Sequence, residues 1–284
     1  MKILYWKDIE KAYRKRHKTR VSKKIQEVRD FFNKPTALSI GAFDGPHLGH
    51  ERLFDTVLAE KKDGSLAGLV SFIQSPKMRS KKNFQGEISS LRLRTSFFEE
   101  KNFDFIILID FSPKFSRMEG KLFLSILFFV SNTKFLAIGP DFRCGFQGRT
   151  GLKEIASLVK EKGIHLEVLD EFLVSGLGAR STKIREAVYV GDFETAQILL
   201  GRAYIFDLVS ARKGKKIGLK KNVWQISAGK TSQVLPPEGS YRVKALFADG
   251  SFLFASCIRE AHFLRLELHE DSTENVVAIS FGYR

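Results

Sequence analysis

The residue types best suited to chemistry gather in one glycine-rich segment, Gly41-Ala42-Phe43-Asp44-Gly45-Pro46-His47-Leu48-Gly49-His50. An apolar run, Ala37–Ile40, precedes it and predicts a strand, and a helix is expected to follow over His50–Glu60. Glycines let a backbone approach a phosphate closely and adopt torsions that other residues avoid. The start of a helix presents free N–H groups and a partial positive charge to an anion. The segment therefore predicts a site for a phosphate-bearing ligand.

His47 and His50 supply the titratable groups of this segment. Their spacing of three lets both imidazoles face one ligand at the start of a helix. Beside a phosphate they can donate hydrogen bonds to charge that grows in a transition state. Taken alone, such a pair is more often two accidental surface residues. A metal site is a further interpretation, but no other His or Cys cluster completes it.

A second segment, Gly139-Pro140-Asp141-Phe142-Arg143-Cys144-Gly145, follows the apolar run Phe135–Ile138. Asp141 can accept hydrogen bonds from a sugar or a base, and Arg143 can meet a phosphate. The simpler interpretation is a turn that carries an Asp–Arg surface pair.

The third segment is Ala179-Arg180-Ser181-Thr182-Lys183-Ile184-Arg185. Ser181 is a natural helix N-cap, and capping alone would explain it. However, a helix start with two hydroxyls and three nearby cations also suits a polyphosphate tail.

The elements that must position these segments alternate between strand and helix from about residue 36 to residue 200. Short apolar strands between amphipathic helices predict a Rossmann-like α/β fold, with a parallel sheet covered on both faces. Ligands bind at the carboxyl ends of such strands, which are the positions of the first two segments. Strands are expected at Ala37–Ile40, Leu66–Phe72, Phe103–Ile109, Phe135–Ile138 and His165–Leu169, and helices at His50–Glu60, Ser90–Glu100, Gly120–Val130, Lys153–Lys162, Thr182–Val190 and Phe193–Leu200, with Gly191 closing the penultimate one.

The pattern changes from Tyr204 onward, where period-two apolar stretches and turn residues predict a small antiparallel β-barrel-like domain. We therefore expect two domains, residues 1–200 and 201–284. The predicted strands are Tyr241–Phe247, Ser251–Ile258, Phe263–Leu268 and Val276–Phe281.

Composition is that of a folded protein, with 43% hydrophobic and 28% charged residues. The formal net charge is +15, and much of it lies in Lys7–Lys34. Such an excess suits nucleic acid, an anionic membrane or a phosphorylated ligand. A solvated basic face is the simplest interpretation, because an RNA-binding arm would be expected to interleave aromatic residues.

The chain shows no sign of export or membrane insertion. Cys144 and Cys257 are too few and too far apart for a disulfide framework or a thiolate metal site. The first residues lack the apolar stretch of a signal peptide. Leu122–Val130 is about half the length needed to span a bilayer and is predicted to be a buried helix. A cytoplasmic protein is expected.

Taken together, the three segments resemble those of bacterial FAD synthetases, within the larger HxGH nucleotidyltransferase superfamily. GAFDGPHLGH is similar to that family's G-x-F-D-G-x-H-x-G-H signature, and GPDFRCG to its G-x-D-F-x-F-G segment. RSTKIREAVYVGDFETAQILLGRAY resembles its S-S-T-x-I-R segment and the helices after it. The resemblance covers about residues 36–205, in the right order and spacing. It implies transfer of AMP from ATP to FMN, which gives FAD and pyrophosphate, with Mg²⁺ bridging the ATP phosphates.

The resemblance also implies site residues. His47 and His50 would hold the ATP phosphates, and Ser181, Thr182 and Arg185 would grip the β- and γ-phosphates. Asp141 would contact the nucleotide. The remaining ATP-binding residues are expected to be Gly41, Phe43, Asp44, Gly45, Gly49 and Arg180. The sequence departs from the family pattern at Arg180, where the first Ser is expected, and at Cys144, where the second Phe is expected.

Most family members carry a riboflavin kinase barrel at the carboxyl end, marked by a glycine-rich turn and a G-x-P-T-A-N motif. The corresponding stretch, Lys213–Val223, keeps the turn but has no P-T-A-N. The expected catalytic Glu aligns near Arg265. We therefore expect a kinase-like module that has lost kinase activity.

Other functions remain as alternatives. The chain could be a bifunctional riboflavin kinase and FAD synthetase, or a cytidylyltransferase acting on a phosphorylated head-group. A nucleic-acid-binding protein with a degenerate site is an alternative of another class, supported by the +15 charge and the basic amino terminus. The expected partners are ATP and FMN, with neither a membrane nor a nucleic acid, and the sequence does not indicate an oligomeric state.

Overall fold

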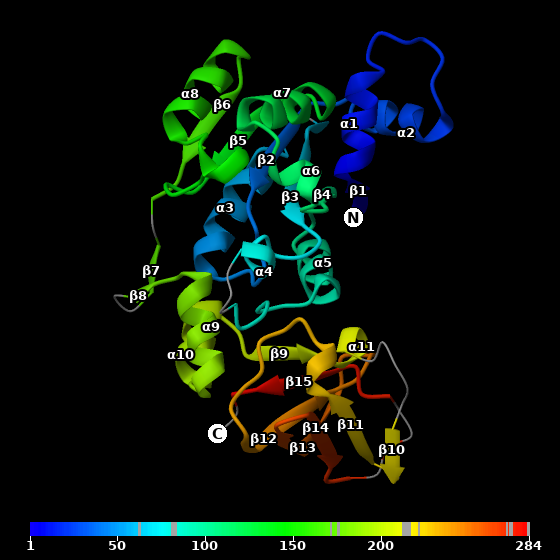
Figure 1. Ribbon diagram of the computed structural model, residues 1–284, viewed down its shortest axis with the longest axis vertical. Helices are drawn as coiled ribbons and strands as arrows, with labels where there is room; N and C mark the ends of the chain where they lie inside the picture. Colours follow the sequence, from blue (N-terminus) through cyan, green and yellow to red (C-terminus); the bar gives the residue numbers. More distant parts are fainter. Residues whose placement is uncertain are drawn as a thin grey trace. The chain divides into compact units, whose positions relative to one another are not determined.

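The computed structural model describes residues 1–61, 64–80, 84–170, 172–174, 177–211, 217–220, 222–270, 272 and 275–282 (Figure 1). The chain divides into two compact units that each draw on several segments. Unit 1 comprises Met1–Phe43, Gly49–Pro76 and Ser96–Glu171, and unit 2 comprises Asp44–Leu48, Lys77–Thr95 and Phe172–Arg284.

Unit 1 is built on a six-stranded sheet in which every pair of neighbours is parallel. The strand order is β1-β4-β3-β2-β5-β6. The inner strands β2 and β4 are buried along their whole length, as expected for a parallel sheet with both faces covered. The strands are β1 Lys2–Tyr5, β2 Thr36–Ile40, β3 Leu66–Phe72, β4 Phe105–Ile109, β5 Thr133–Ile138 and β6 His165–Val168.

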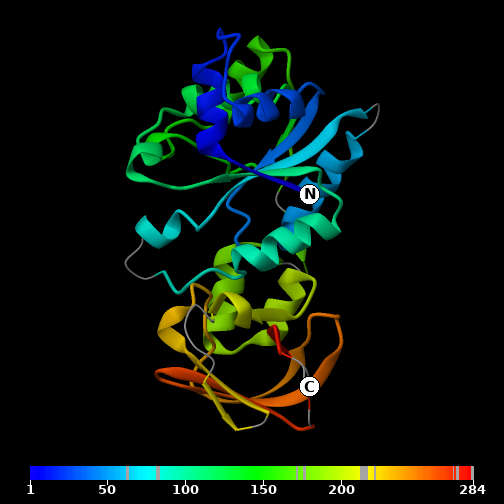
Figure 2. The same cartoon turned by 90° about the vertical axis from the view of Figure 1, so that its right-hand side faces the viewer.

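Helices cover both faces of this sheet (Figures 1 and 2). One face packs against α1 (Trp6–Arg14), α2 (Lys23–Phe31), α7 (Gly120–Val130) and α8 (Leu152–Glu161) in one apolar core. The other face meets α3 (Leu48–Ala59) and the end of α5 (Leu91–Glu100). There Phe54 contacts Phe98 and Phe103 edge-on, with ring centroids 5.6 Å apart in both cases. Some of the 26 phenylalanines of the chain therefore fill this layer. The short elements are α6 Pro113–Ser116 and a 3₁₀ turn, Phe146–Gly148.

Unit 2 contains a curled, seven-stranded antiparallel sheet of order β10-β11-β14-β13-β12-β15-β9 (Figure 1). Its buried face and the helices α9 (Ser181–Val190) and α10 (Phe193–Leu200) share one apolar core. The strands are β9 Tyr204–Asp207, β10 Ile217–Lys220, β11 Val223–Ser227, β12 Gly239–Leu246, β13 Phe252–Glu260, β14 Phe263–Leu268 and β15 Ala278–Phe281. The short elements are α4 Lys77–Ser80, the hairpin β7 Leu173–Val174 and β8 Leu177–Gly178, α11 Leu208–Ala211 and a 3₁₀ turn, Ala228–Lys230.

The predicted fold class is confirmed, a parallel α/β sheet followed by an antiparallel β module. Gly191 closes α9 in the left-handed conformation, as predicted. The helix predicted at Leu122–Val130 is α7, but Leu122 and Phe129 on it are exposed. Among the described residues, no helix is long and apolar enough to cross a membrane.

Candidate functional site

The first predicted segment leaves the carboxyl end of β2, where the order of the strands reverses. From β2 the chain builds β3 and β4 on one side, and it later adds β5 and β6 on the other. Ser39 of β2 lies beside Ala137 of β5, so Gly41 and Gly139 follow neighbouring parallel strands. A crevice opens at such a reversal point, and ligands of open α/β sheets bind there. The first two segments thus meet at the edge predicted for the nucleotide.

The backbone of the first segment turns sharply at Phe43, whose φ is 43°. The Phe43 ring folds back over Gly41, where a Cβ atom would lie 2.5 Å from a ring carbon. A Cβ atom on Gly45 would lie 2.5 Å from the side chain of Ile88. These two glycines are therefore required by packing within the protein. The expected role of these glycines was instead to let the backbone approach a phosphate closely.

The two histidines flank the start of α3. His47 immediately precedes the helix and is buried, with 5% of its surface exposed. His50 lies in the first turn, where its ring meets Phe43 edge-on at 5.0 Å and stacks near Phe54 at 6.1 Å. Aromatic packing on two sides fixes the His50 ring, because a rotated ring would overlap its neighbours. A fixed imidazole at a helix N-terminus can stabilise phosphate charge without reorganisation.

Asp44 and Arg185 join the first segment to the third within unit 2. Arg185 Nη2 donates to Asp44 Oδ2 at 2.6 Å, and Arg185 Nε donates to the Gly86 carbonyl at 2.7 Å. Both side chains are at least nine-tenths buried. The guanidinium also lies 4.8 Å from the centroid of the Phe84 ring. The predicted phosphate ligand Arg185 is thus largely engaged by protein groups.

A second buried pair, Glu87 and Arg94, lies in the same unit at 3.7 Å and was not predicted from the sequence. Burial lowers the pKa of Arg94, and the charges of Glu87 and Asp44 oppose that effect. Arg185 links Asp44 of the first segment to the Gly86 carbonyl, and the Glu87–Arg94 pair lies within the segment that follows Gly86. Charged residues so close in sequence are usually solvated, and only the tertiary fold buries Glu87 and Arg94.

The second segment presents Asp141 to solvent, and no atom outside the immediate chain neighbours lies within 4 Å of the space beside Gly139. Arg143 donates to the Gly148 carbonyl at 3.3 Å. Cys144 exchanges backbone hydrogen bonds with Thr150, and burial raises the pKa of its thiol to about 12. Because the thiolate is the reactive form, Cys144 is not a nucleophile at neutral pH.

The third segment begins α9, but the interpretation of Ser181 as its N-cap is wrong. Ser181 is the first helical residue, and Arg180 occupies the N-cap position without a side-chain cap. The N–H groups of this turn therefore receive no side-chain oxygen from the capping residue. Thr182 and Lys183 beside them are exposed. An anion can bind such an uncapped turn.

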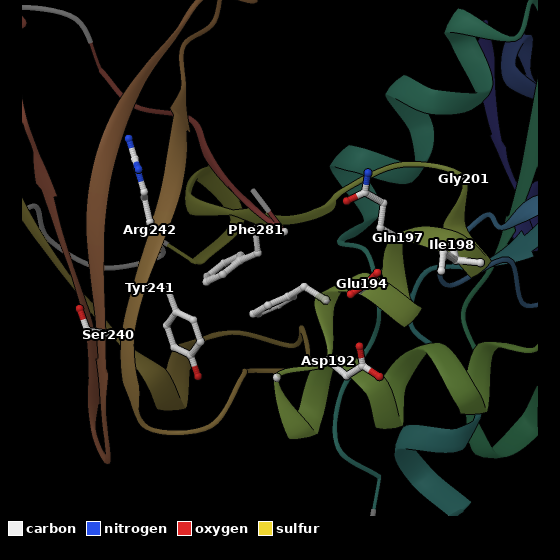
Figure 3. Close-up of a pocket in the computed structure, with 12 residues that line it drawn as sticks. Asp192, Glu194, Gln197, Ile198, Gly201, Ser240, Tyr241, Arg242 and Phe281 are labelled. Carbon is white, nitrogen blue, oxygen red and sulfur yellow. The ribbon is translucent and has the colours of Figure 1, made fainter. Parts of the chain in front are cut away.

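The structure also has a cavity that includes none of the predicted site residues. It measures about 870 Å³ and lies between α10 and the strands β12 and β15 of unit 2 (Figure 3). Asp192 and Glu194 line it together with the aromatic side chains of Tyr241 and Phe281. Its lining carries these two carboxylates against one guanidinium, that of Arg242, so a triphosphate would meet net negative charge there.

A cavity of about 340 Å³ in unit 1 was not predicted. It opens at the carboxyl ends of β1 and β4, at the same sheet edge as the first two segments. Trp6 is 5% exposed there, and its buried indole Nε1 has no hydrogen-bond partner among the described residues. No sequence pattern indicated this cavity, because β1 is short and was not predicted. Its lining includes Tyr5, Trp6, Ile73, Asp110, Ser112 and Phe115.

Comparisons with known proteins agree with this geometry. Residues 30–183 match the model of the FAD synthetase family, FAD_syn. Curated relatives described as bifunctional riboflavin kinase/FMN adenylyltransferase include one from Buchnera aphidicola subsp. Schizaphis graminum, 30% identical over 75% of this chain and 69% of its own. Another, from Haemophilus influenzae, is 29% identical over 75% and 70% of the two chains.

A solved structure titled a macrolide-efflux protein from Streptococcus pneumoniae superposes with a TM-score of 0.71. It is 19% identical, covering 88% of this chain and 93% of its own, and at that identity it supports the fold alone. The family model spans more than half of the sequence and includes the first two segments and the start of the third. This chain therefore belongs to the FAD synthetase family of nucleotidyltransferases.

Proposed function

We propose that this chain is an FMN adenylyltransferase, which makes FAD and pyrophosphate from FMN and ATP and does not phosphorylate riboflavin. The observation that carries the proposal is the meeting of two glycine-rich segments at the strand-order reversal between β2 and β5. Family membership supports the reaction, and the Asp44–Arg185 pair supports a link between the first and third segments.

In this proposal His47 and His50 hold the ATP phosphates, and Asp141 contacts the nucleotide. Ser181 and Thr182 bind the β- and γ-phosphates with the N–H groups of the first turn of α9. The residues Gly41, Phe43, Asp44, Gly45, Gly49 and Arg180 shape the ATP pocket. Arg185 has a positioning role as well as its predicted phosphate contact, since two of its nitrogens hold Asp44 and the Gly86 carbonyl.

The reaction is an in-line displacement. A phosphate oxygen of FMN attacks the α-phosphorus of ATP, one P–O bond forms, and the bond to the β-phosphate breaks to release pyrophosphate. The attacking phosphate is already anionic and needs no general base, so catalysis is positioning and neutralisation of charge. The histidines and the α9 turn supply that positive potential.

Magnesium enters this scheme with the substrate. The described residues include no group of three or more His, Cys, Asp and Glu side chains arranged for a metal ion. Mg²⁺ commonly binds through substrate phosphates and water rather than through a protein cage, so these residues are compatible with MgATP. Bound Mg²⁺ would neutralise phosphate charge.

We further propose that the isoalloxazine ring of FMN occupies the cavity beside Trp6. The cavity combines apolar walls with a few polar groups, as small-molecule sites commonly do. Trp6 lines this cavity, and an aromatic side chain there can pack against the flavin ring. The Trp6→Phe variant should raise the KM for FMN and leave the KM for ATP unchanged. Equal changes in both constants would contradict this placement.

Direct assay tests the main proposal. Protein, MgATP and FMN should yield FAD and pyrophosphate in equal amounts, separated by chromatography, whereas CTP with a phosphorylated head-group should yield no product.

His47→Ala and His50→Ala should each lower the rate by about 10²–10³, by analogy with the loss of one oxyanion donor. The exposed His262 provides a matched control, since His262→Ala removes an imidazole far from the segment in sequence. Full turnover in both histidine variants would refute their role.

The alternative is a bifunctional enzyme, which the curated relatives favour because their names include riboflavin kinase. The proposed loss rests on the missing P-T-A-N motif and on Arg265 at the expected Glu position. Residues 213–216 and 221 of the corresponding stretch, Lys213–Val223, lie outside the described part of the chain. Arg265 lies in β14 between Gln225 and Ile258. Incubation with riboflavin and ATP should give no FMN, and FMN formation would establish the bifunctional alternative.

A further inference from the structure

The most positively charged part of the chain is a helical hairpin. It precedes most of the region that matches the FAD synthetase family. The helices α1 and α2 pack together through Ile9, Ala12, Ile25 and Val28, which are all buried. Residues 11–24, in the second half of α1, the connecting segment and the start of α2, contain eight Lys and Arg residues and no Asp or Glu. All eight basic side chains are exposed. They are Lys11, Arg14, Lys15, Arg16, Lys18, Arg20, Lys23 and Lys24.

The segment between the helices is held in one conformation. Arg29 of α2 reaches back and donates to the Lys15 carbonyl at 2.6 Å and to the Lys18 carbonyl at 3.1 Å. The Arg16 guanidinium lies 4.3 Å from the centroid of the Tyr13 ring. These contacts fix the backbone that carries the cations. A ligand would therefore meet a pre-formed surface, which lowers the entropy lost on binding.

Acidic groups neutralise only a minority of this charge. Arg14 pairs with Glu10 at 2.5 Å, and Lys24 pairs with Asp8 at 2.8 Å. Within the described part of the chain, no carboxylate lies in ion-pair range of Lys11, Lys15, Arg16, Lys18, Arg20 or Lys23. Ordinary solvated surfaces mix charges of both signs, so six unneutralised cations on one short hairpin indicate a polyanionic partner.

The position of the hairpin separates it from the nucleotide site. The helix α1 follows β1, the edge strand of the sheet, and the strands β4 and β3 lie between β1 and β2. The first two predicted segments lie at the carboxyl edge. The cavity proposed for the flavin is lined from α1 only by Trp6, Lys7 and Glu10, so the basic residues 11–24 lie outside it.

The chemistry favours nucleic acid over a membrane. A helix that binds a membrane surface inserts apolar side chains, and no large hydrophobic residue of α1, α2 or their connection is exposed. Nucleic acid supplies a row of phosphates that Lys and Arg neutralise with release of counterions. The hairpin offers no exposed aromatic platform for bases, so binding should be independent of sequence.

We propose that the α1–α2 hairpin binds the sugar-phosphate backbone of nucleic acid, in addition to the proposed enzyme activity. This differs from the expectation from sequence that nucleic acid is not a partner. Contact with about five phosphates of a DNA duplex would make log K fall with log salt at a slope of about −4 to −5. Affinity should then weaken by roughly 10²–10³ between 50 and 200 mM KCl.

The test uses the full chain and fluorescein-labelled 20-mers, both single-stranded RNA and duplex DNA, in anisotropy titrations across that salt range. The hairpin variant Lys15→Gln/Arg16→Gln/Lys18→Gln/Arg20→Gln removes four cations. The control variant Lys121→Gln/Lys134→Gln/Lys160→Gln/Lys162→Gln removes four exposed cations from elsewhere in unit 1. FAD formation and thermal unfolding report whether each variant remains folded.

The hairpin variant should lose at least tenfold in affinity at 50 mM KCl and show a shallower salt slope, while the control variant binds as the parent does. FAD formation should not change in either variant. Equal losses in both variants would show that net charge alone drives binding, and the proposal would fall. It would also fall if the parent did not bind at 50 mM KCl, or if it bound phosphatidylserine vesicles in preference to either oligonucleotide.

Discussion

The Asp44 carboxylate and the Arg185 guanidinium are both withdrawn from water, with side-chain exposures of 3% and 5%. Removing one partner leaves a buried charge without compensation, which typically costs about 3–5 kcal/mol. Asp44→Asn and Arg185→Met should each lower the free energy of unfolding by about that amount in urea titrations. The double variant should lose less than the sum, because the second change removes a charge that is already uncompensated.

A more exposed pair supplies the control for this prediction. Lys101 and Glu51 are 3.4 Å apart, with about a third of each side chain exposed. Solvent screens such a pair, so Lys101→Met should lower the stability by less than about 1 kcal/mol. Similar losses for Lys101→Met and Arg185→Met would contradict the view that burial makes the Asp44–Arg185 pair important.

A second prediction for a single residue concerns Cys144. Since burial raises the pKa of its thiol to about 12, the thiolate population at pH 8 is far below that of an ordinary cysteine. Alkylation by iodoacetamide should be slow at pH 8 and should accelerate as the pH rises toward 12. Mass spectrometry of the Cys144 peptide measures this rate, with a small model thiol as reference. Rapid alkylation at pH 8 would show that the thiol is not shielded.

At the scale of elements, α9 and α10 both end at a left-handed glycine. Gly191 has a φ of 82° and Gly201 a φ of 73°. A Cβ atom on Gly191 would lie 3.5 Å or more from its neighbours, whereas one on Gly201 would lie 2.6 Å from Leu48 Cδ2. Gly191→Ala should therefore cost only the backbone strain, about 1–2 kcal/mol. Gly201→Ala should cost more, because Leu48 must also move.

The Gly201→Ala variant also connects stability to the candidate site, since Leu48 is in the segment that carries both histidines. Displacing Leu48 should lower adenylyl transfer in Gly201→Ala and leave it unchanged in Gly191→Ala. Melting temperatures and FAD formation of the two variants test both statements. Equal melting temperatures and equal rates of FAD formation in the two variants would show that Leu48 can move without lowering stability or activity.

Some of the helices and strands could be predicted from the sequence, and others could not. The inner strands β2, β3 and β5 are apolar runs in parallel pairing, and their positions could be predicted because burial on both faces leaves an uninterrupted hydrophobic pattern. Two helices, α1 and α2, and the edge strand β1 were not predicted. Charged residues surround their few buried positions, so the local pattern resembles a solvated stretch.

The residues of the candidate site also differ in whether the sequence alone could identify them. Its histidines and glycines could be found because they are neighbours in sequence. The partners of Asp44 could not, since Arg185 lies 141 residues away and only the tertiary fold brings it near. The cavity beside Trp6 is a similar case, because it combines residues that follow three different strands with residues of α1 and α6.

For the molecule as a whole, stability in acid should depend on Asp207, which joins the segment around residue 90 to the antiparallel sheet of unit 2. Arg92 donates to its carboxylate through Nη2 at 2.7 Å, and the hydroxyls of Ser90 and Ser210 donate at 2.5 and 2.6 Å. Burial opposes its ionisation, but hydrogen bonds from Arg92, Ser210 and Ser90 outweigh that effect and lower the pKa of Asp207.

A carboxyl group whose pKa is lower in the folded state stabilises the fold at pH values above its unfolded pKa of about 3.9. That contribution is lost as the pH falls through the folded value. The parent chain should therefore lose stability below about pH 4. Asp207→Asn should lower stability at pH 7 by about 2 kcal/mol, because the buried acceptor of the Arg92, Ser90 and Ser210 hydrogen bonds loses its charge. Between pH 7 and pH 3 the variant should lose less stability than the parent, since it has one fewer carboxylate to protonate. Urea titrations at these two pH values measure both effects, and parallel losses in the two proteins would show that Asp207 does not control unfolding in acid.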